Sequence, residues 1–214
     1  MLKILFFSVF LPNLSFAGTT VFFSPKGGCE EQASQIVTSS KTDLEIAVYS
    51  LNSPTVVAAI KGAIERGVHV RILTDRTQAF GKGNLEATKT LASLTPDFRV
   101  HSKNRIMHNK YAIADSKKLM LGSFNWTRSA ENSNDENCLI TDDAKVVQAY
   151  ENRFNEHLWI ANTAEKSNAI LSLKGIKIFR RSLASEKDIL LARPKKGNGS
   201  ILDSAKEQTF STGH

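Results

Sequence analysis

Cysteine, glycine and proline are all scarce in this 214-residue sequence. Its two cysteines, Cys29 and Cys138, are too few for a disulfide scaffold or a four-thiolate zinc site. With 12 glycines and 5 prolines, the collagen-like and low-complexity classes are excluded. Hydrophobic residues at 41% and charged residues at 23% exclude wholesale disorder. A chain of this length and composition predicts one globular domain with a terminal extension.

Long apolar runs are also missing, since no stretch reaches the ~20 residues that a membrane-spanning helix needs. The one short run, over residues 4–11, follows Lys3 and leads to small residues at Ser15 and Ala17. This order predicts a secretory signal over residues 1–17, with an uncleaved anchor or a buried strand as the alternatives. We therefore expect an exported protein, periplasmic or secreted, in whose oxidising surroundings the two cysteines could pair.

The positive charge is distributed unevenly. The net charge is +7, and residues 1–160 contribute 18 basic minus 16 acidic residues, or +2. Residues 161–214 contribute 10 minus 5, or +5, and we expect them to form a basic, flexible extension. Such a tail favours a polyanionic partner, either nucleic acid or an anionic membrane, although it could equally serve solubility alone.

The central part of the chain alternates strand and helix patterns. Residues 44–51 form an apolar strand pattern, Ser53 and Pro54 begin a helix, and residues 68–74 form the next strand. This unit predicts an α/β fold with parallel strands over residues 18–160. Further strands are expected at 19–24, 99–101, 110–114, 119–121 and 137–141, and helices at 30–39, at 85–94, as a turn at 126–131, and after Asp143.

Polar residues able to bind a phosphate gather between residues 108 and 136. His108 and Lys110 are two apart and share one side of a strand, as do Ser123 and Asn125. Carboxylates are too scarce there for a divalent metal cage. A lysine point charge, two neutral donors and a histidine nucleophile or proton carrier instead suit a phosphoryl group.

The order and spacing of these residues resemble the phospholipase D superfamily. The matching pattern is His108-x-Lys110-x4-Asp115-x6-Gly122-Ser123-x-Asn125, followed by Glu136. The resemblance covers about residues 20–159 and is widest to the small single-motif bacterial members, the Nuc-like endonucleases. It implies a mixed, mostly parallel β-sheet flanked by helices on both faces. The turn at residues 27–29 also looks like that of bacterial members described as phospholipase D.

The resemblance implies metal-independent phosphodiester cleavage without a cofactor. His108 would attack phosphorus and form a phosphohistidine, and a second motif histidine would protonate the leaving oxygen. The complete motif occurs only once in this chain. A twofold homodimer that brings two His108 side chains into one site would supply the second histidine, as in the single-motif members of the family.

The other motif residues would support this chemistry. Lys110 and Asn125 would hold the phosphoryl oxygens, and Ser123 would support the phosphate or the nucleophile. Glu136 would accept the second ring N–H of a motif histidine. The remaining two matched positions, Asp115 and Gly122, would be structural.

Residues outside the motif could also contact substrate. Arg105 could reach a flanking phosphate, while Trp126 could stack on a base or belong to the core. Arg76 and Lys82 could line a groove, although a solvated loop is the simpler interpretation.

The substrate class stays open between nucleic acid and phospholipid. The favoured function is a sequence-nonspecific endonuclease acting on DNA or RNA, supported by the basic extension. A phospholipase D with the same residues is the alternative, and Phe80 or Phe124 could supply its apolar rim. A non-enzymatic polyanion binder is disfavoured, because every motif residue is present.

Overall fold

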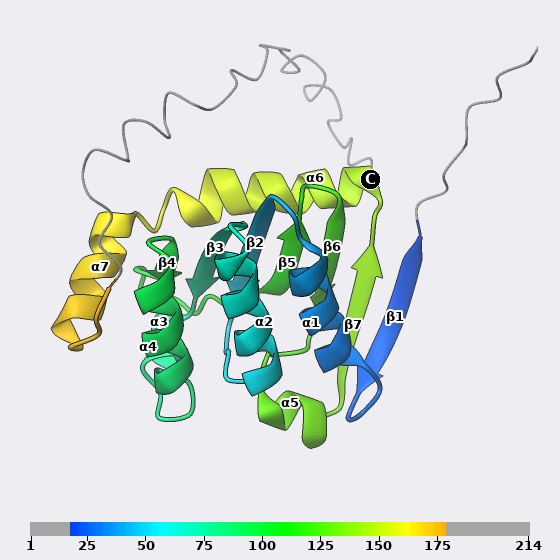
Figure 1. Cartoon of the computed structure of the whole chain (residues 1–214), viewed down its shortest axis with the longest axis horizontal. Helices are drawn as coiled ribbons and strands as arrows, with labels where there is room; N and C mark the ends of the chain where they lie inside the picture. The colour runs from blue at the N-terminus through cyan, green and yellow to red at the C-terminus, as the bar shows by residue number, and fades with distance from the viewer. Residues whose placement is uncertain (1–17, 179–214) are drawn as a thin grey trace, which may run out of the picture. The chain divides into compact units, whose positions relative to one another are not determined.

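The computed structural model describes residues 18–178, which form a single seven-stranded sheet covered by helices (Figure 1). The predicted signal, residues 1–17, and the extension beyond residue 178 lie outside the described residues. The strand order is β1-β7-β6-β5-β2-β3-β4. The strands are β1 (Thr19–Ser24), β2 (Asp43–Val48), β3 (His69–Thr74), β4 (Phe98–Val100), β5 (Lys110–Ala114), β6 (Lys118–Gly122) and β7 (Glu136–Thr141).

The sheet is mixed, as predicted, but the expectation of mostly parallel strands is wrong. Only the pairs β2–β3 and β3–β4 are parallel, whereas β1–β7, β7–β6, β6–β5 and β5–β2 are antiparallel. The parallel pairs are the two that helical crossovers connect. The turn between β5 and β6 is too short for a crossover, so these strands must run in opposite directions.

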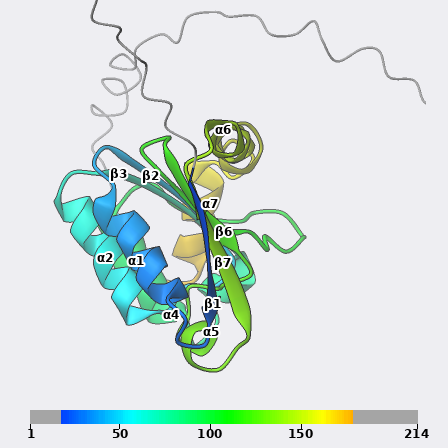
Figure 2. The ribbon, with the colours of Figure 1, turned by 90° about the vertical axis from the view of Figure 1, so that its right-hand side faces the viewer.

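Helices cover both faces of the sheet, which confirms the expected layering (Figure 2). One face carries α1 (Cys29–Ser39), α2 (Pro54–Glu65) and α4 (Leu85–Leu94), and the other carries α6 (Ala144–Asn152) with its π-helical continuation Arg153–Trp159. The short helix α5 (Arg128–Asn132) lies at the lower end of the sheet in Figure 1, and the short helix α3 (Arg76–Ala79) follows β3 in the chain. Within residues 18–178, no helix has both the length and the apolar character needed to cross a bilayer.

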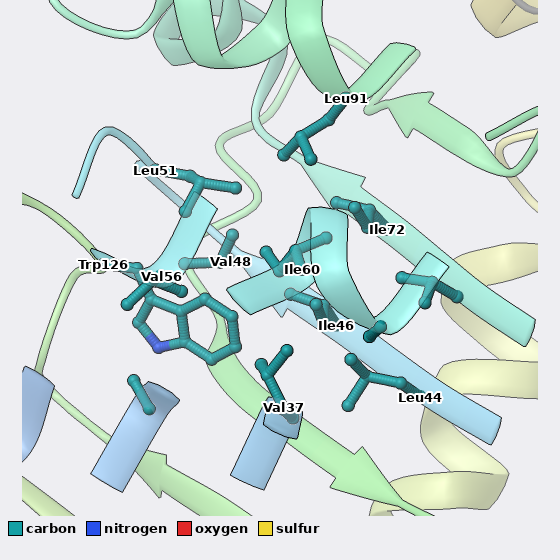
Figure 3. Packing of buried hydrophobic residues seen from close by; sticks show 14 of the residues in the cluster. Val37, Leu44, Ile46, Val48, Leu51, Val56, Ile60, Ile72, Leu91 and Trp126 are labelled. Atoms are coloured by element: carbon teal, nitrogen blue, oxygen red, sulfur yellow. The ribbon is translucent and has the colours of Figure 1, made fainter. Parts of the chain in front are cut away.

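The larger core lies between the sheet and the α1, α2 and α4 layer. Figure 3 shows the Trp126 ring among Val37, Val48 and Val56 in this core. A disulfide between Cys29 and Cys138, with Cα atoms 5.9 Å apart, joins α1 to β7 within this core. The two cysteines whose pairing the sequence left open are therefore bonded and buried.

The packed domain continues past residue 160, where the sequence analysis ended it. Helix α7 (Ala164–Leu173) lies against the edge strand β4, and its Ser167 Oγ accepts a hydrogen bond from the Val100 amide at 2.9 Å. Leu171 and Ile176 are buried in the larger core. The apolar residues of this ten-residue helix do not gather on one face, so the periodic signal is weak, although the helix covers an otherwise open sheet edge.

Candidate active site

The end of β5 carries the first two motif residues. His108 lies two residues before the first residue of the strand and is exposed, and its ring packs on Tyr49 with the ring centroids 4.5 Å apart. Lys110 is the first residue of β5, and 8% of it is exposed. Its Nζ donates a hydrogen bond to the His108 carbonyl oxygen at 2.9 Å and lies 5.1 Å from the centroid of the Tyr49 ring. The ammonium and the exposed imidazole therefore both lie against the Tyr49 ring.

The electrostatic state of Lys110 follows from this position. Burial lowers the pKa of Lys110 below its usual value, and the nearby charge of Glu136 partly opposes that shift. A buried ammonium with a carbonyl oxygen as its hydrogen-bond acceptor retains unused donors. It is therefore prepared to receive an anionic oxygen, as a phosphate would offer.

Ser123 and Glu136 meet where β6 ends and β7 begins. Ser123 Oγ donates to Glu136 Oε2 at 2.6 Å and accepts from the Asn137 amide at 3.1 Å. Asn134 Nδ2 donates to the other carboxylate oxygen at 3.0 Å. Within one protomer, the Glu136 carboxylate is thus held by Ser123 and Asn134 rather than by a histidine ring.

Gly122 permits the close approach of these two strands. Its φ of +155° lies outside the usual range of L-residues, and a Cβ placed there would lie 2.3 Å from the Asn137 carbonyl oxygen. Any side chain would push β6 away from β7 and separate Ser123 from Glu136.

Asn125 lies on the loop two residues beyond Ser123. Its Oδ1 is buried and has no hydrogen-bond partner among the residues that the structure describes. The flanking residues Phe124 and Trp126 are both buried, so the loop is anchored on either side of the amide. The unpartnered Oδ1 is an acceptor, so it cannot itself bind a phosphoryl oxygen, and the predicted phosphate role of Asn125 would rest on its Nδ2 donor.

Asp115 lies at the opposite end of β5, away from these residues. Its carboxylate accepts hydrogen bonds from the backbone amides of Lys41, Thr42 and Asp43 and from the Thr42 hydroxyl, at 2.8–3.1 Å. Partial burial alone would raise the pKa of Asp115, but these hydrogen bonds outweigh it and lower the pKa below its usual value. The motif aspartate therefore ties the start of β2 to the end of β5.

The fold and the site can now be compared with known proteins. A family model described as a cardiolipin synthase, PLD-like domain matches residues 34–159, which is more than half of the chain. The chain belongs to the phospholipase D superfamily. The structure of a superfamily member, Nuc from Salmonella typhimurium, is 26% identical, with a TM-score of 0.63, and the match covers 69% of this chain and 97% of that one. The predicted phospholipase D-like fold is thereby confirmed.

Two further superfamily members are similar in sequence. A mitochondrial cardiolipin hydrolase of Xenopus tropicalis is 35% identical over 120 residues, which is 56% of each chain. A phospholipase D of Rickettsia prowazekii is 31% identical over 140 residues, covering 65% of this chain and 67% of the relative. The chain spans just over half the length of the Xenopus relative.

Two of the predicted substrate-contacting aromatic residues are in fact core residues. Trp126 and Phe124 are each 1% exposed, so neither can stack on a base or form an apolar rim. Phe80 is partly buried and packs against the core. The sequence could not separate these roles, because a large aromatic residue beside a motif fits either one.

The predicted basic residues are placed differently from one another. Arg105 is exposed in the loop between β4 and β5 and lines a surface pocket together with Arg76. Lys82 is exposed but is not among the residues that line this pocket.

Three residues near the site were missed by the sequence analysis. Tyr49, just after β2, contacts both His108 and Lys110, but its place in an apolar strand pattern concealed it. Asp75, just after β3, accepts from the Met107 amide at 3.1 Å, and its position as an N-cap was the available signal. His101 stands two residues before Lys103, a second His-x-Lys pair without the motif aspartate.

Proposed function

We propose that the protein is a metal-independent phosphodiesterase that cleaves nucleic acid without sequence preference, through a phosphohistidine intermediate. The observation that carries this proposal is that the exposed His108 imidazole and the buried Lys110 ammonium lie against the same ring, that of Tyr49. This arrangement presents a nucleophile and a charge-stabilising group to the same phosphate. Membership of the phospholipase D superfamily supports the same class of reaction.

The reaction would proceed in two displacements. A ring nitrogen of His108 attacks phosphorus, the bond to the leaving oxygen breaks, and a second histidine gives that oxygen a proton. The same second histidine then takes a proton from water, which attacks phosphorus and releases His108. Lys110 and Asn125 hold the non-bridging oxygens through both steps.

The second histidine would come from another copy of the chain. Within the described residues, His69 is engaged by Asp43 and Asp97 at the end of β3 remote from His108. His101 is 3% exposed, and burial lowers its pKa. A twofold homodimer would place two His108 rings on either side of one phosphate.

The edge of the sheet beside the site supports such a dimer. On β1, Val21 is 48% and Phe23 is 63% exposed, which is unusual for large apolar side chains on an edge strand. Phe23 pairs in register with Asn137, so this edge strand runs beside β7, which begins at Glu136. A second copy is the partner that would bury these side chains and complete the site together.

Phospholipid is the alternative substrate, because relatives of the chain are named as a phospholipase D and a cardiolipin hydrolase. One structural observation is compatible with it: Ile106 in the loop before His108 is 67% exposed and could contact acyl chains or a vesicle surface. The buried Cys29–Cys138 disulfide supports export to an oxidising compartment in either case.

The deciding experiment is cleavage of single- and double-stranded DNA in EDTA by the chain starting at Gly18. We expect activity that His108→Ala abolishes, with a phosphoryl adduct detectable on His108 by mass spectrometry after rapid acid-free quenching. Absence of cleavage by a folded dimer would overturn the nuclease proposal and turn the search to phospholipid vesicles.

The shared site has its own test. When wild type and His108→Ala are co-expressed in equal amounts, about one quarter of the dimers keep two His108 residues. Total activity should therefore fall to about one quarter of that of the same amount of wild-type protein. A fall to only one half would mean that each protomer acts alone.

A further inference from the structure

A surface pocket lies between the start of α3 and the loop that joins β4 to β5. Its basic lining residues are Arg76, Lys103 and Arg105. Lys103 and Arg105 are exposed, and Arg76 is partly exposed. Among the residues that the structure describes, none of these three cations forms an ion pair with a carboxylate. Three cations around one hollow favour an anionic ligand.

One carboxylate, Asp75, also lines the pocket, but its oxygens are occupied. Asp75 Oδ1 accepts from the amides of Thr77 and Gln78, and Oδ2 accepts from the amide of Met107. Asp75 is 5% exposed, so its charge is directed into the protein rather than into the pocket. The pocket therefore keeps a positive excess at its open side.

The loop that lines the pocket leads directly to the nucleophile, His108. The loop is fixed at its start by the His101 amide, which donates to the Thr74 carbonyl at 2.9 Å, and at its end by Asp75. Met107 is followed directly by His108, so the loop that carries two of the cations also positions the nucleophile.

We propose that this pocket binds the backbone phosphate next to the scissile phosphate of a nucleic acid strand. The proposal rests on the proposed nuclease function and specifies how its substrate is held. Arg105 and His108 are three positions apart in the sequence, so their Cα atoms are at most about 11 Å apart. Because a strand of B-form DNA carries a phosphate every ~3.4 Å along its axis, a neighbouring phosphate falls within this reach.

The chemistry of the lining suits repeated phosphates better than a single diester. Arginine binds phosphate oxygens in a bidentate manner, and lysine adds a point charge. A substrate with only one phosphate would be held at His108 and Lys110 alone. The pocket would therefore discriminate by the number of phosphates and not by the bond that is cleaved.

The test compares Lys103→Ala/Arg105→Ala with a control of equal charge change, Lys41→Ala/Lys117→Ala. Lys41 and Lys117 are exposed at the opposite end of the sheet, beside Asp115. Both variants and the wild type are assayed on a DNA oligonucleotide and on bis(4-nitrophenyl) phosphate, which has one phosphate. Melting temperatures establish that both variants are folded.

We expect the pocket variant to raise KM for the oligonucleotide roughly five- to tenfold at 0.15 M salt, with kcat nearly unchanged. The slope of log KM against log salt should fall by about 1 to 2, reflecting lost phosphate contacts. Activity on bis(4-nitrophenyl) phosphate should match that of the wild type. Equal losses in the pocket variant and the control, or an equal loss on both substrates, would overturn the proposal.

Failure of the proposed function would be distinguishable from failure of the pocket. If the wild type cleaves bis(4-nitrophenyl) phosphate but not DNA, the nuclease function is wrong. In that case, a selective loss of activity on cardiolipin vesicles in the pocket variant would assign the pocket to a lipid with two phosphates. If the wild type cleaves DNA and the pocket variant does so equally well, only the pocket proposal is wrong. DNA binding in a His108→Ala background, measured by fluorescence anisotropy, should weaken by the same factor as KM rises.

Discussion

The two ends of β5 carry residues of the same motif that differ in how their polar groups are satisfied. At one end, Lys110 is buried with a carbonyl oxygen as its hydrogen-bond acceptor, and His108 is exposed. At the other end, the Asp115 carboxylate accepts from three backbone amides and a hydroxyl. Unused capacity marks the end prepared for a ligand, and saturated capacity marks the end that holds the fold together.

The same contrast appears between Asn125 and Asp75. The Asn125 Oδ1 is buried without a partner among the described residues, whereas both oxygens of Asp75 are taken by backbone amides. The unpartnered acceptor of Asn125 costs stability, while the satisfied carboxylate of Asp75 stabilises the loop before His108. Substitutions at the two kinds of position should therefore separate activity from stability.

The largest effect is expected from Lys110→Met. Activity should fall by about 10²- to 10³-fold, because the charge that stabilises the phosphoryl oxygens is lost. Since the pKa of Lys110 is lowered in the fold, its charged form opposes folding at neutral pH, and the melting temperature should not fall. Activity is measured by diester hydrolysis and the melting temperature by calorimetry, on the same preparation of the variant. A large drop in melting temperature with only a modest loss of activity would show that Lys110, like Asp115, mainly stabilises the fold.

Glu136→Gln should have the next largest effect. It preserves a hydrogen-bonding partner for Ser123 and Asn134 but removes the charge that raises the pKa of Lys110. We expect activity to fall by about 10²-fold and the alkaline limb of the pH–activity profile to move to lower pH. Ser123→Ala is the matched control, because it removes a hydrogen bond without removing a charge. An alkaline limb that does not move would show that Glu136 acts only as a structural acceptor.

Asp115→Ala should reverse the pattern, with activity largely retained and stability lost. Removal of the acceptor for four donors should lower the free energy of unfolding by about 1–3 kcal/mol. Because the folded pKa of Asp115 lies below its usual value of 3.8, this stabilisation is present above that pH and disappears as pH falls through the folded pKa. Urea unfolding at several pH values should show wild type and variant converging in acid. A constant difference down to the lowest pH would contradict this role.

The smallest effect concerns the alkaline stability of the wild type. The unfolded chain holds the Lys110 proton up to a pKa of 10.5, whereas the folded chain releases it at lower pH. Between these two pKa values, Lys110 is neutral in the folded protein and no longer opposes folding. The free energy of unfolding of the wild type should therefore rise with pH relative to that of Lys110→Met. This rise is measured as the difference in unfolding free energy between the wild type and Lys110→Met, determined at a series of pH values up to 10.5. A difference independent of pH would show that the proton is not released early.

Much of the fold followed from local patterns. The helix at Leu85–Leu94 and the strand at Lys110–Ala114 have the bounds that periodicity predicted, and Ser53 caps α2 through a hydrogen bond from the Val56 amide. The order of parallel and antiparallel pairs was not predictable in this way, because it depends on which end of the sheet each connection returns to. The contribution of α7 was also missed, since it depends on the edge of β4 that it covers.

The sequence by itself determined the motif, the phospholipase D-like fold and the chemistry that a histidine, a lysine and neutral donors can perform. These properties depend on residue types at fixed spacings, which carry the resemblance to the superfamily. Only the tertiary structure decided that Trp126 belongs to the core, that Tyr49 lies against His108 and Lys110, and that Asp75 holds the loop before the nucleophile. Burial and contacts between distant segments arise from packing of the whole chain, and no local pattern encodes them.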